Sequence, residues 1–265
     1  MISLSLIDLT WAGALVLLLG GVTLKLRLGV SRDLVVASAR MVVQLTLIGL
    51  VLKVLFAQRD LIWVVVMSGV MVLVAGREVV LRQRRRLRGW GAWLIGTGSL
   101  AVSSFTLACF ALVVMVRPDP WYHPQYAIPL LGMLLGNTMN GIALALDRLT
   151  HELWTQREAI EQRLMLGESV AEATRGILSE AVRGALIPVI NAMAVAGLVS
   201  LPGMMTGQIL SGVEPTMAVR YQILIWLLIA AGSGFGMLVA VHLACRKLFD
   251  ERDRLRLERL EKVLR

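Results

Sequence analysis

Ionisable side chains are almost absent from the long hydrophobic stretches of this 265-residue chain, and this absence excludes several functional classes. No aspartate or glutamate lies in the middle of such a stretch, and the three histidines are scattered at His123, His151 and His242. A proton-coupled carrier usually needs a buried carboxylate or a histidine relay. An intramembrane metalloenzyme needs clustered His, Asp or Cys ligands. The sequence offers neither set, and no secure metal site is predicted.

Two other common features are also missing. The two cysteines, Cys109 and Cys245, are predicted to pack in hydrophobic segments rather than to form a disulfide. No Gly-x-x-x-x-Gly-Lys-Ser/Thr pattern occurs, so the chain cannot cradle nucleotide phosphates by that route. If the protein moves a solute uphill, we expect the energy to come from a partner.

What the chain has in abundance is apolar sequence. Hydrophobic residues make up 57% of it, which is too many for a soluble domain of this size. A helix that crosses ~30 Å of hydrocarbon needs ~20 mainly apolar residues. The sequence therefore predicts an all-α polytopic membrane protein with about seven transmembrane helices in one domain, residues 1–247. The predicted spans are 6–24, 34–55, 61–76, 91–116, 126–146, 186–211 and 221–245.

Basic residues give this arrangement an orientation. Of the 27 lysines and arginines, 22 lie between alternate pairs of spans or in the C-terminal tail. The positive-inside rule then predicts an outer N-terminus and a cytoplasmic C-terminus. The net charge of +9 is thereby explained by topology, so no nucleic acid is implied, although a basic run could touch anionic lipid.

A few polar residues inside the spans are candidates for a transport pathway. Arg40 and Gln44 are four residues apart and share a helix face. Arg40 either snorkels to the inner interface, with Gln44 bonding another helix, or both line an inner vestibule. Asn137 and Asn140 are pathway candidates because amides in lipid must find partners or water, and they could equally bond across helices.

The sixth span carries an unusual interruption. Pro202 removes a backbone hydrogen bond and is expected to kink or break the helix. Broken helices at membrane depth occur where the backbone lines a cavity or packs on protein. Pro202, Gly203, Met204 and Met205 are therefore candidate gate residues, the alternative being a kink with packing consequences only.

Small residues recur four positions apart in three places, a spacing that lets helices approach closely in lipid. Packing within the chain is the preferred interpretation, ahead of dimerisation. The pairs are Gly132 with Gly136, Gly203 with Gly207, and Gly232 with Gly236.

The largest predicted non-membrane segment between spans is 148–183. It is expected to form two helices with a break at Gly167. Its second helix carries an apolar stripe at three- to four-residue steps, which could dock on a partner or belong to a solvated linker helix. The stripe is Val170, Thr174, Ile177 and Ala181. The basic run 82–88 is interpreted as a topology anchor, and 248–265 is predicted to be a charged cytoplasmic helix.

Several segments together resemble one family over nearly the whole chain. They are Ala-Arg-x-x-x-Gln-Leu-x-x-x-Gly at 39–49, Ile-Pro-x-x-Gly-Met-x-x-Gly-Asn-x-Met at 128–139, Leu166-Gly167, Arg-Gly-Ala-Leu-Ile-Pro at 183–188, and Gly-Leu-Val-Ser-Leu-Pro-Gly-Met-Met-Thr-Gly at 197–207. The chain is similar to the FetB-like ABC transporter permeases, which include bacterial iron-export permeases and plant aluminium-tolerance proteins.

The resemblance implies an ABC permease-type transmembrane domain in the cell inner membrane, and a transport subunit rather than an enzyme. The chain would pair with a separate ATP-binding subunit, two copies of each. ATP and magnesium would bind to that partner, and no cofactor to this chain. The resemblance also implies export of iron or a related metal.

The segment around Gly167 looks like the coupling loop of ABC permeases, with Glu161, Gly167 and Ile177 at matching offsets. It departs from that pattern in having Gln162 and Arg163 where two alanines are usual. The residues expected to couple the chain to the ATPase are Glu161, Gly167, Glu168, Ala171 and Glu172.

Other functions stay open on the sequence alone. The chain could be an ABC permease for another small or organic substrate, in either direction. It could be a secondary carrier or channel without an ATPase, against which the missing buried acid argues. It could also be a membrane scaffold or sensor that signals through residues 148–183.

Overall fold

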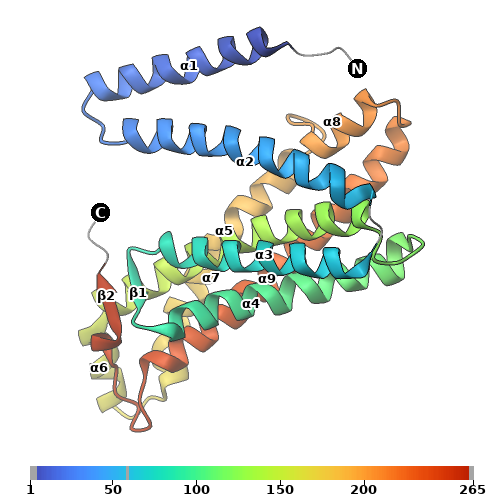
Figure 1. The fold of residues 1–265 in the computed structure, drawn as a ribbon. Coiled ribbons are helices and arrows are strands. Elements are labelled where there is room, and N and C mark those ends of the chain that lie inside the picture. Colours follow the sequence, from blue (N-terminus) through green and yellow to red (C-terminus); the bar gives the residue numbers. More distant parts are fainter. Residues whose placement is uncertain (1–4, 58–59, 263–265) are drawn as a thin grey trace. The chain divides into compact units, whose positions relative to one another are not determined.

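The protein is built almost entirely of helices, as a computed structural model that describes residues 5–57 and 60–262 shows (Figure 1). Seven helical segments are long and apolar enough to cross a membrane, which confirms the predicted number of spans. The chain divides into two compact units, Met1–Arg59 and Asp60–Arg265.

The first unit is a hairpin of two helices. Its helices are α1 (Leu6–Lys25) and α2 (Ser31–Ala57). Ser5 and Asp8 form a capping box at the start of α1, where each side chain accepts a hydrogen bond from the other's backbone N–H. At the turn, the hydroxyls of Thr23 and Ser31 lie 2.8 Å apart and tie the end of one helix to the start of the next.

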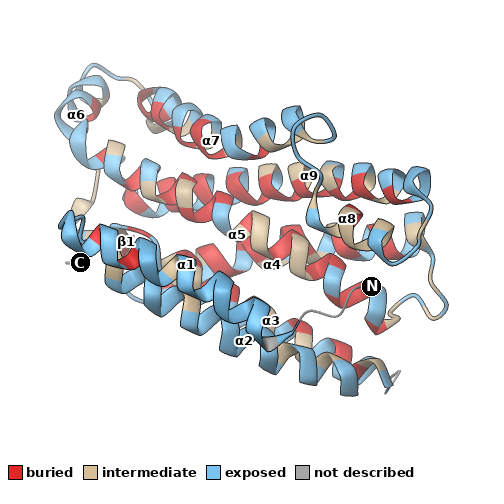
Figure 2. Cartoon of the chain, turned by 90° about the horizontal axis from the view of Figure 1, so that it is seen from above, coloured by how far each residue is buried: buried red, intermediate tan, exposed pale blue. Residues whose placement is uncertain are grey.

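The second unit is a helix bundle with a small sheet at one end. It contains α3 (Leu61–Leu81), β1 (Arg85–Leu87), α4 (Trp90–Phe110), the π-helix η1 (Ala111–Val116), α5 (Pro124–Thr155), α6 (Arg157–Met165), α7 (Val170–Val195), α8 (Gly203–Leu210), α9 (Pro215–Leu248), the 3-10 helix η2 (Leu257–Arg259) and β2 (Leu260–Lys262). Helix α5 is central, because it packs against α3, α4, α7 and α9. Its side chains Leu134, Ile142, Leu149 and Leu153 are fully buried, and Figure 2 shows buried residues along its length.

Close approach of α9 to α4 and α5 depends on two glycines. The Ser103 hydroxyl donates to the Gly232 carbonyl at 2.6 Å, across the contact between α4 and α9. A Cβ atom at Gly236 would lie 2.7 Å from a methyl of Thr138 on α5, closer than packed atoms can approach. This pair therefore packs within the chain, as predicted. The predicted packing pair Gly203 and Gly207 differs, because neither has an atom within 4 Å of a Cβ position.

The sixth span differs from the prediction in both its start and its break. Helix α7 begins at Val170 and passes through Pro188 to Val195, so it joins residues expected to be a separate cytoplasmic helix. The break starts seven residues before Pro202, at a tight turn in which the Val195 carbonyl accepts from three successive amides and Gly197 adopts φ +85°. Pro202 is the N-cap of α8, where its missing N–H costs nothing.

The C-terminal tail is not the predicted helix over 248–265. Its described part bends back after Phe249 and ends in η2 and β2, and residues 263–265 lie outside the described residues. Asp250 causes the bend, because its carboxylate accepts the backbone N–H groups of Arg252 and Arg254 at 3.0 and 2.9 Å. Local bonds of this kind compete with a helix. Strand β2 then pairs with β1 antiparallel.

Candidate functional site

The α6–α7 turn, residues 163–173, is the candidate site for a partner. It ends α6 with a Schellman motif, in which Gly167 N–H donates to the Leu164 carbonyl at 3.1 Å and Glu168 N–H to the Arg163 carbonyl at 3.1 Å. Gly167 has φ +93°, in the left-handed region that favours glycine. The predicted break at Gly167 is therefore confirmed, and the backbone conformation is its cause.

Arg163 stabilises the turn through an ion pair and two hydrogen bonds. Its guanidinium lies 2.6 Å from the Glu168 carboxylate and donates to the carbonyls of Glu172 and Ala173 at 3.2 and 3.0 Å. These bonds join the end of α6 to the first turn of α7. The departure from the coupling-loop pattern at this position thus has a structural role, which the sequence analysis missed. An arginine five residues before a glutamate, with glycine between, was the available signal.

The predicted coupling residues divide into two groups. Glu168 is held by Arg163, and Glu172 closes a capping box with Ser169, whose hydroxyl lies 2.6 Å from the Glu172 carboxylate. These two acids shape the turn. Glu161 and Ala171 are exposed, so they are accessible to a partner.

The apolar stripe of α7 does not face a partner, which corrects one interpretation of the sequence. Thr174, Ile177 and Ala181 are buried inside the bundle. The Thr174 hydroxyl donates to the Val170 carbonyl at 2.7 Å and contacts the Cys245 thiol of α9 at 3.7 Å. A periodic stripe identifies an apolar face without saying what covers it, and here α5 and α9 cover it.

The apolar surface of the turn is instead formed by Met165 and Leu166. Their side chains are 79% and 85% exposed, immediately before Gly167. The turn is joined to α7 directly and to α5 through α6, and both long helices run into the bundle. A force applied to Leu166 would therefore reach the bundle core through helices rather than through flexible loops.

A second polar cluster fixes the loop between α3 and α4 to α5. Arg82 donates to the Asn140 side chain, and Arg84 N–H donates to the Asp147 carboxylate at 2.7 Å. The Thr150 hydroxyl donates to the Arg85 carbonyl at 3.0 Å. The Arg85 guanidinium lies 4.0 Å from the centre of the Trp154 ring. The run predicted to be a topology anchor is thus also bound along one face of α5.

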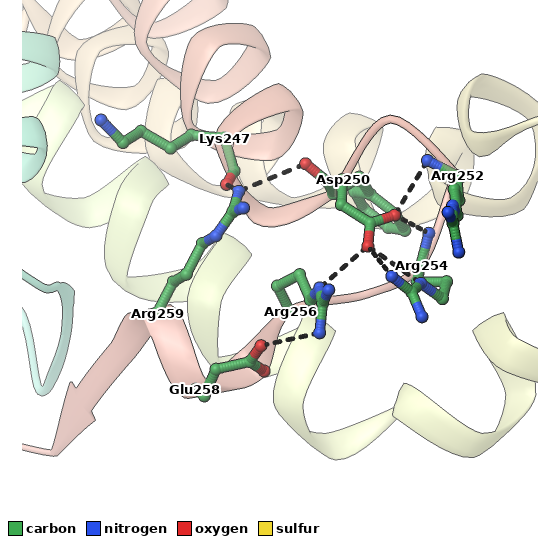
Figure 3. Close-up of polar contacts among 8 residues, drawn as sticks. Lys247, Asp250, Arg252, Arg254, Arg256, Glu258 and Arg259 are labelled. Carbon is green, nitrogen blue, oxygen red and sulfur yellow. Dashed lines mark hydrogen bonds and ion pairs between the residues drawn. The ribbon is translucent and has the colours of Figure 1, made fainter.

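The C-terminal tail also contacts the loop between α3 and α4. Arg259 donates to the carbonyl of Lys247 (Figure 3) and to that of Phe249. Arg88 N–H donates to the Arg259 carbonyl at 2.7 Å. The backbone N–H of Arg254, together with its guanidinium, holds the pKa of Asp250 well below its usual range. Asp250 therefore stays ionised at a more acidic pH than a free aspartate would, and it also binds Arg256 at 2.9 Å.

Replacing Asp147 with alanine is expected to loosen the α3–α4 loop, because Arg84 N–H loses its acceptor. A single hydrogen bond of this kind contributes ~0.5–1.5 kcal/mol, which corresponds to roughly two- to tenfold more frequent opening. Limited trypsin digestion would measure this, since the loop is rich in arginine. Asp147→Asn keeps an acceptor and is the control. Equal cleavage rates for both variants would contradict the assignment.

A small polar cleft lies behind the α6–α7 turn, between α5 and α7. It encloses about 330 Å³, and its walls include Arg148, Glu152, Arg163 and Glu180. Arg148 also covers Gly184 of α7 so closely that a Cβ atom there would collide with its guanidinium. The cleft is lined by side chains of both charges, which indicates that α5 and α7 are held together here by electrostatic contacts.

The predicted pathway residues lie on three helices. Arg40 and Gln44 are exposed on α2 in the first unit. Asn137 donates to the Met133 carbonyl of its own helix at 2.9 Å, and Asn140 binds Arg82. In α8, Met205 is buried while Gly203 is exposed. Together with Pro202 and Met204 of the same segment, these positions stay predictions for the pathway.

Within residues 5–57 and 60–262, no three His, Cys, Asp or Glu side chains come close enough together to hold a metal ion.

Comparison with known proteins matches the chain to one protein family. Residues 6–249 match the model of a family described as "Uncharacterised protein family (UPF0014)". The UPF0014 membrane protein slr1647 of Synechocystis is 38% identical over 95% of this chain and 98% of its own length. No solved structure matches the chain.

Two further relatives carry functional names. The probable iron export permease protein FetB of Escherichia coli is 28% identical, over 90% of each chain. The protein ALUMINUM SENSITIVE 3 of Arabidopsis thaliana is 31% identical over 91% of this chain and 86% of its own length.

Proposed function

The chain belongs to the UPF0014 family of membrane proteins, and from this premise we propose that it is the permease subunit of an ATP-driven ABC transporter. It does not hydrolyse ATP itself. A separate ATP-binding subunit carries ATP and magnesium and docks on the α6–α7 turn. The complex contains two copies of each subunit and lies in the cell inner membrane.

One observation carries this proposal. Leu166 and Met165 project from a turn whose shape is fixed by Gly167 and by the Arg163–Glu168 ion pair. The two side chains are adjacent in the sequence and lie outside the predicted spans, where contiguous exposed apolar surface marks an interaction site.

The mechanism follows from how the turn is connected. Nucleotide-driven movement of the partner pushes the turn, and the capping box at Ser169 keeps the first turn of α7 intact under that push. Helices transmit such displacement as rigid bodies. The push moves α7 past α5 and changes the position of the segment 196–202 and of α8 beyond it. Pro202, Gly203, Met204 and Met205 then act as the gate, with Asn137 and Asn140 of α5 along the pathway. Gln44 of the first unit is proposed as a pathway residue from its sequence position alone.

The proposed substrate is iron or a related metal, exported from the cytoplasm. Support comes from the name of FetB, a probable iron export permease, which aligns over 90% of this chain. The aluminium-related name of the plant relative is compatible with a metal or with an organic molecule that binds one.

Deleting the gene is expected to raise cellular iron under iron load, because efflux is lost. Metal content measured by mass spectrometry would test this, with the intact gene restored as the control. A Leu166→Asp gene should fail to restore the wild-type level. A lower iron content in the deletion strain would reverse the direction of transport, and unchanged content of every metal would remove the metal substrate.

A further inference from the structure

A long apolar groove runs along the outer side of the bundle between α7 and α9. It encloses about 920 Å³, near the top of the ~300–1,000 Å³ range of small-molecule sites. Its lining extends along α7 from Leu178 to Ile190, a length of ~18 Å at 1.5 Å per residue. Its part from Leu186 to Ile190, with the facing residues of α9, lies on the predicted spans 186–211 and 221–245, so this apolar part is expected to face hydrocarbon.

The walls and the floor of the groove differ in exposure. Ile187, Ile190 and Leu238 are 46%, 56% and 53% exposed, and they form its open sides. Val241 is 1% exposed and forms its floor. Such a surface fits a flexible alkyl chain, which can follow a furrow between two helices.

The apolar part of the groove is bordered by two side chains that can bind an anion. Arg183 of α7 and His242 of α9 both line it, and both are exposed. Arg246 follows His242 by one helical turn, so it lies on the same face of α9. Arg183 has only a loose, exposed ion pair with Glu180, at 3.8 Å, and such pairs contribute little. The guanidinium therefore remains available to an anion.

We propose that this groove binds an anionic glycerophospholipid, with one acyl chain along the apolar furrow and the phosphate at Arg183 and His242. A basic side chain complements the charge of an anionic headgroup, and it lies at the depth where a headgroup is expected. Arg183 lies three residues before the predicted span 186–211, and His242 lies three residues before the end of the predicted span 221–245, so both are near the border predicted to be cytoplasmic. Anionic lipids are concentrated in the cytoplasmic leaflet, and basic pockets between transmembrane helices bind their headgroups.

The position of the site gives it a consequence for the bundle. The lipid would bridge α7, which continues from the partner-binding turn, and α9, which carries the tail. Because it binds both helices, it would favour the arrangement in which the furrow between them keeps its present width. This inference does not rest on ATP-driven transport, since the site is defined by α7 and α9 alone.

The test uses the full chain in nanodiscs of phosphatidylcholine, into which phosphatidylglycerol is titrated while retained lipid is counted by native mass spectrometry. We expect about one phosphatidylglycerol per chain to be held preferentially. Arg183→Gln should weaken this binding about fivefold, and adding His242→Gln should weaken it further, since each basic group near a membrane surface contributes to anion binding. Arg175→Gln is the matched control, because Arg175 is exposed on the same helix but does not line the groove.

A second variant tests the apolar part without altering charge. Ile190→Trp should fill the furrow and reduce retention of phosphatidylglycerol, while Arg183 stays in place. Equal binding of phosphatidylcholine and phosphatidylglycerol would overturn the proposal, as would equal binding by the Arg183 and Arg175 variants. An Ile190→Cys variant gives a further test. If two copies of it cross-linked efficiently and the unsubstituted chain did not, a second chain would occupy the groove and the proposal would be overturned.

Discussion

Replacing Leu166 with aspartate is expected to reduce ATP-dependent transport by ~30-fold while leaving the fold intact. The loss corresponds to ~2 kcal/mol of docking energy, the threshold of an interface hot spot. Leu166 is 85% exposed and lies at the tip of the α6–α7 turn. An aspartate there stays hydrated in the isolated chain, and its carboxylate loses that water, at a cost in free energy, only when a partner covers it. Exposed substitutions of this kind usually change stability by less than ~0.5 kcal/mol.

The measurement is transport in vesicles that contain both subunits, accompanied by a thermal melt of the isolated chain. Leu166→Met is the matched control, because it keeps the side chain apolar and similar in size. It should retain transport close to the wild-type level. Wild-type transport by the aspartate variant would show that the turn does not receive the partner.

Replacing Gly76 with valine is expected to destabilise the bundle by ~1–3 kcal/mol. Gly76 lies on α3, and a Cβ atom there would approach both Cβ and the methyl of Thr97 on α4 to 2.8 Å. Because Thr97 Cβ moves only with its backbone, the two helices must separate to make room. For a chain of this size, ~1 kcal/mol corresponds to roughly 2–4 °C in melting temperature.

Gly69→Val provides the control on the same helix. Nothing lies within 4 Å of a Cβ atom at Gly69, so the substitution changes helix propensity without a clash. Thermal unfolding of the two variants in the same detergent gives the comparison. Equal melting temperatures would mean that α3 and α4 do not pack as closely as described.

The helix count could be predicted from the sequence because it depends on local composition. Each span is an apolar run without acidic residues in its middle, and the turns between spans carry charge, glycine or proline. The turn at Gly167 was also predictable, since glycine favours the left-handed conformation that ends a helix.

Features that depend on distant residues could not be predicted in the same way. Arg82 binds Asn140 across 58 positions, and β1 pairs with β2 through strands of three residues, too short to show a periodic pattern. The predicted helix over 248–265 was wrong because the side chain of Asp250 accepts hydrogen bonds from backbone amides and bends the chain. The spacing of apolar residues gives no information about such bonds. The stripe of α7 was found correctly, yet its covering by α5 and α9 is a tertiary property.

Reconstitution tests the central claim, that this chain forms the membrane path while another subunit supplies the energy. Purified chain is placed in liposomes alone or with the cognate ATP-binding subunit, and ATP-dependent movement of iron is followed. The chain alone should show no response to ATP, and addition of the partner should start transport that Leu166→Asp reduces ~30-fold. ATP-dependent transport at the full rate by the chain alone would contradict the account.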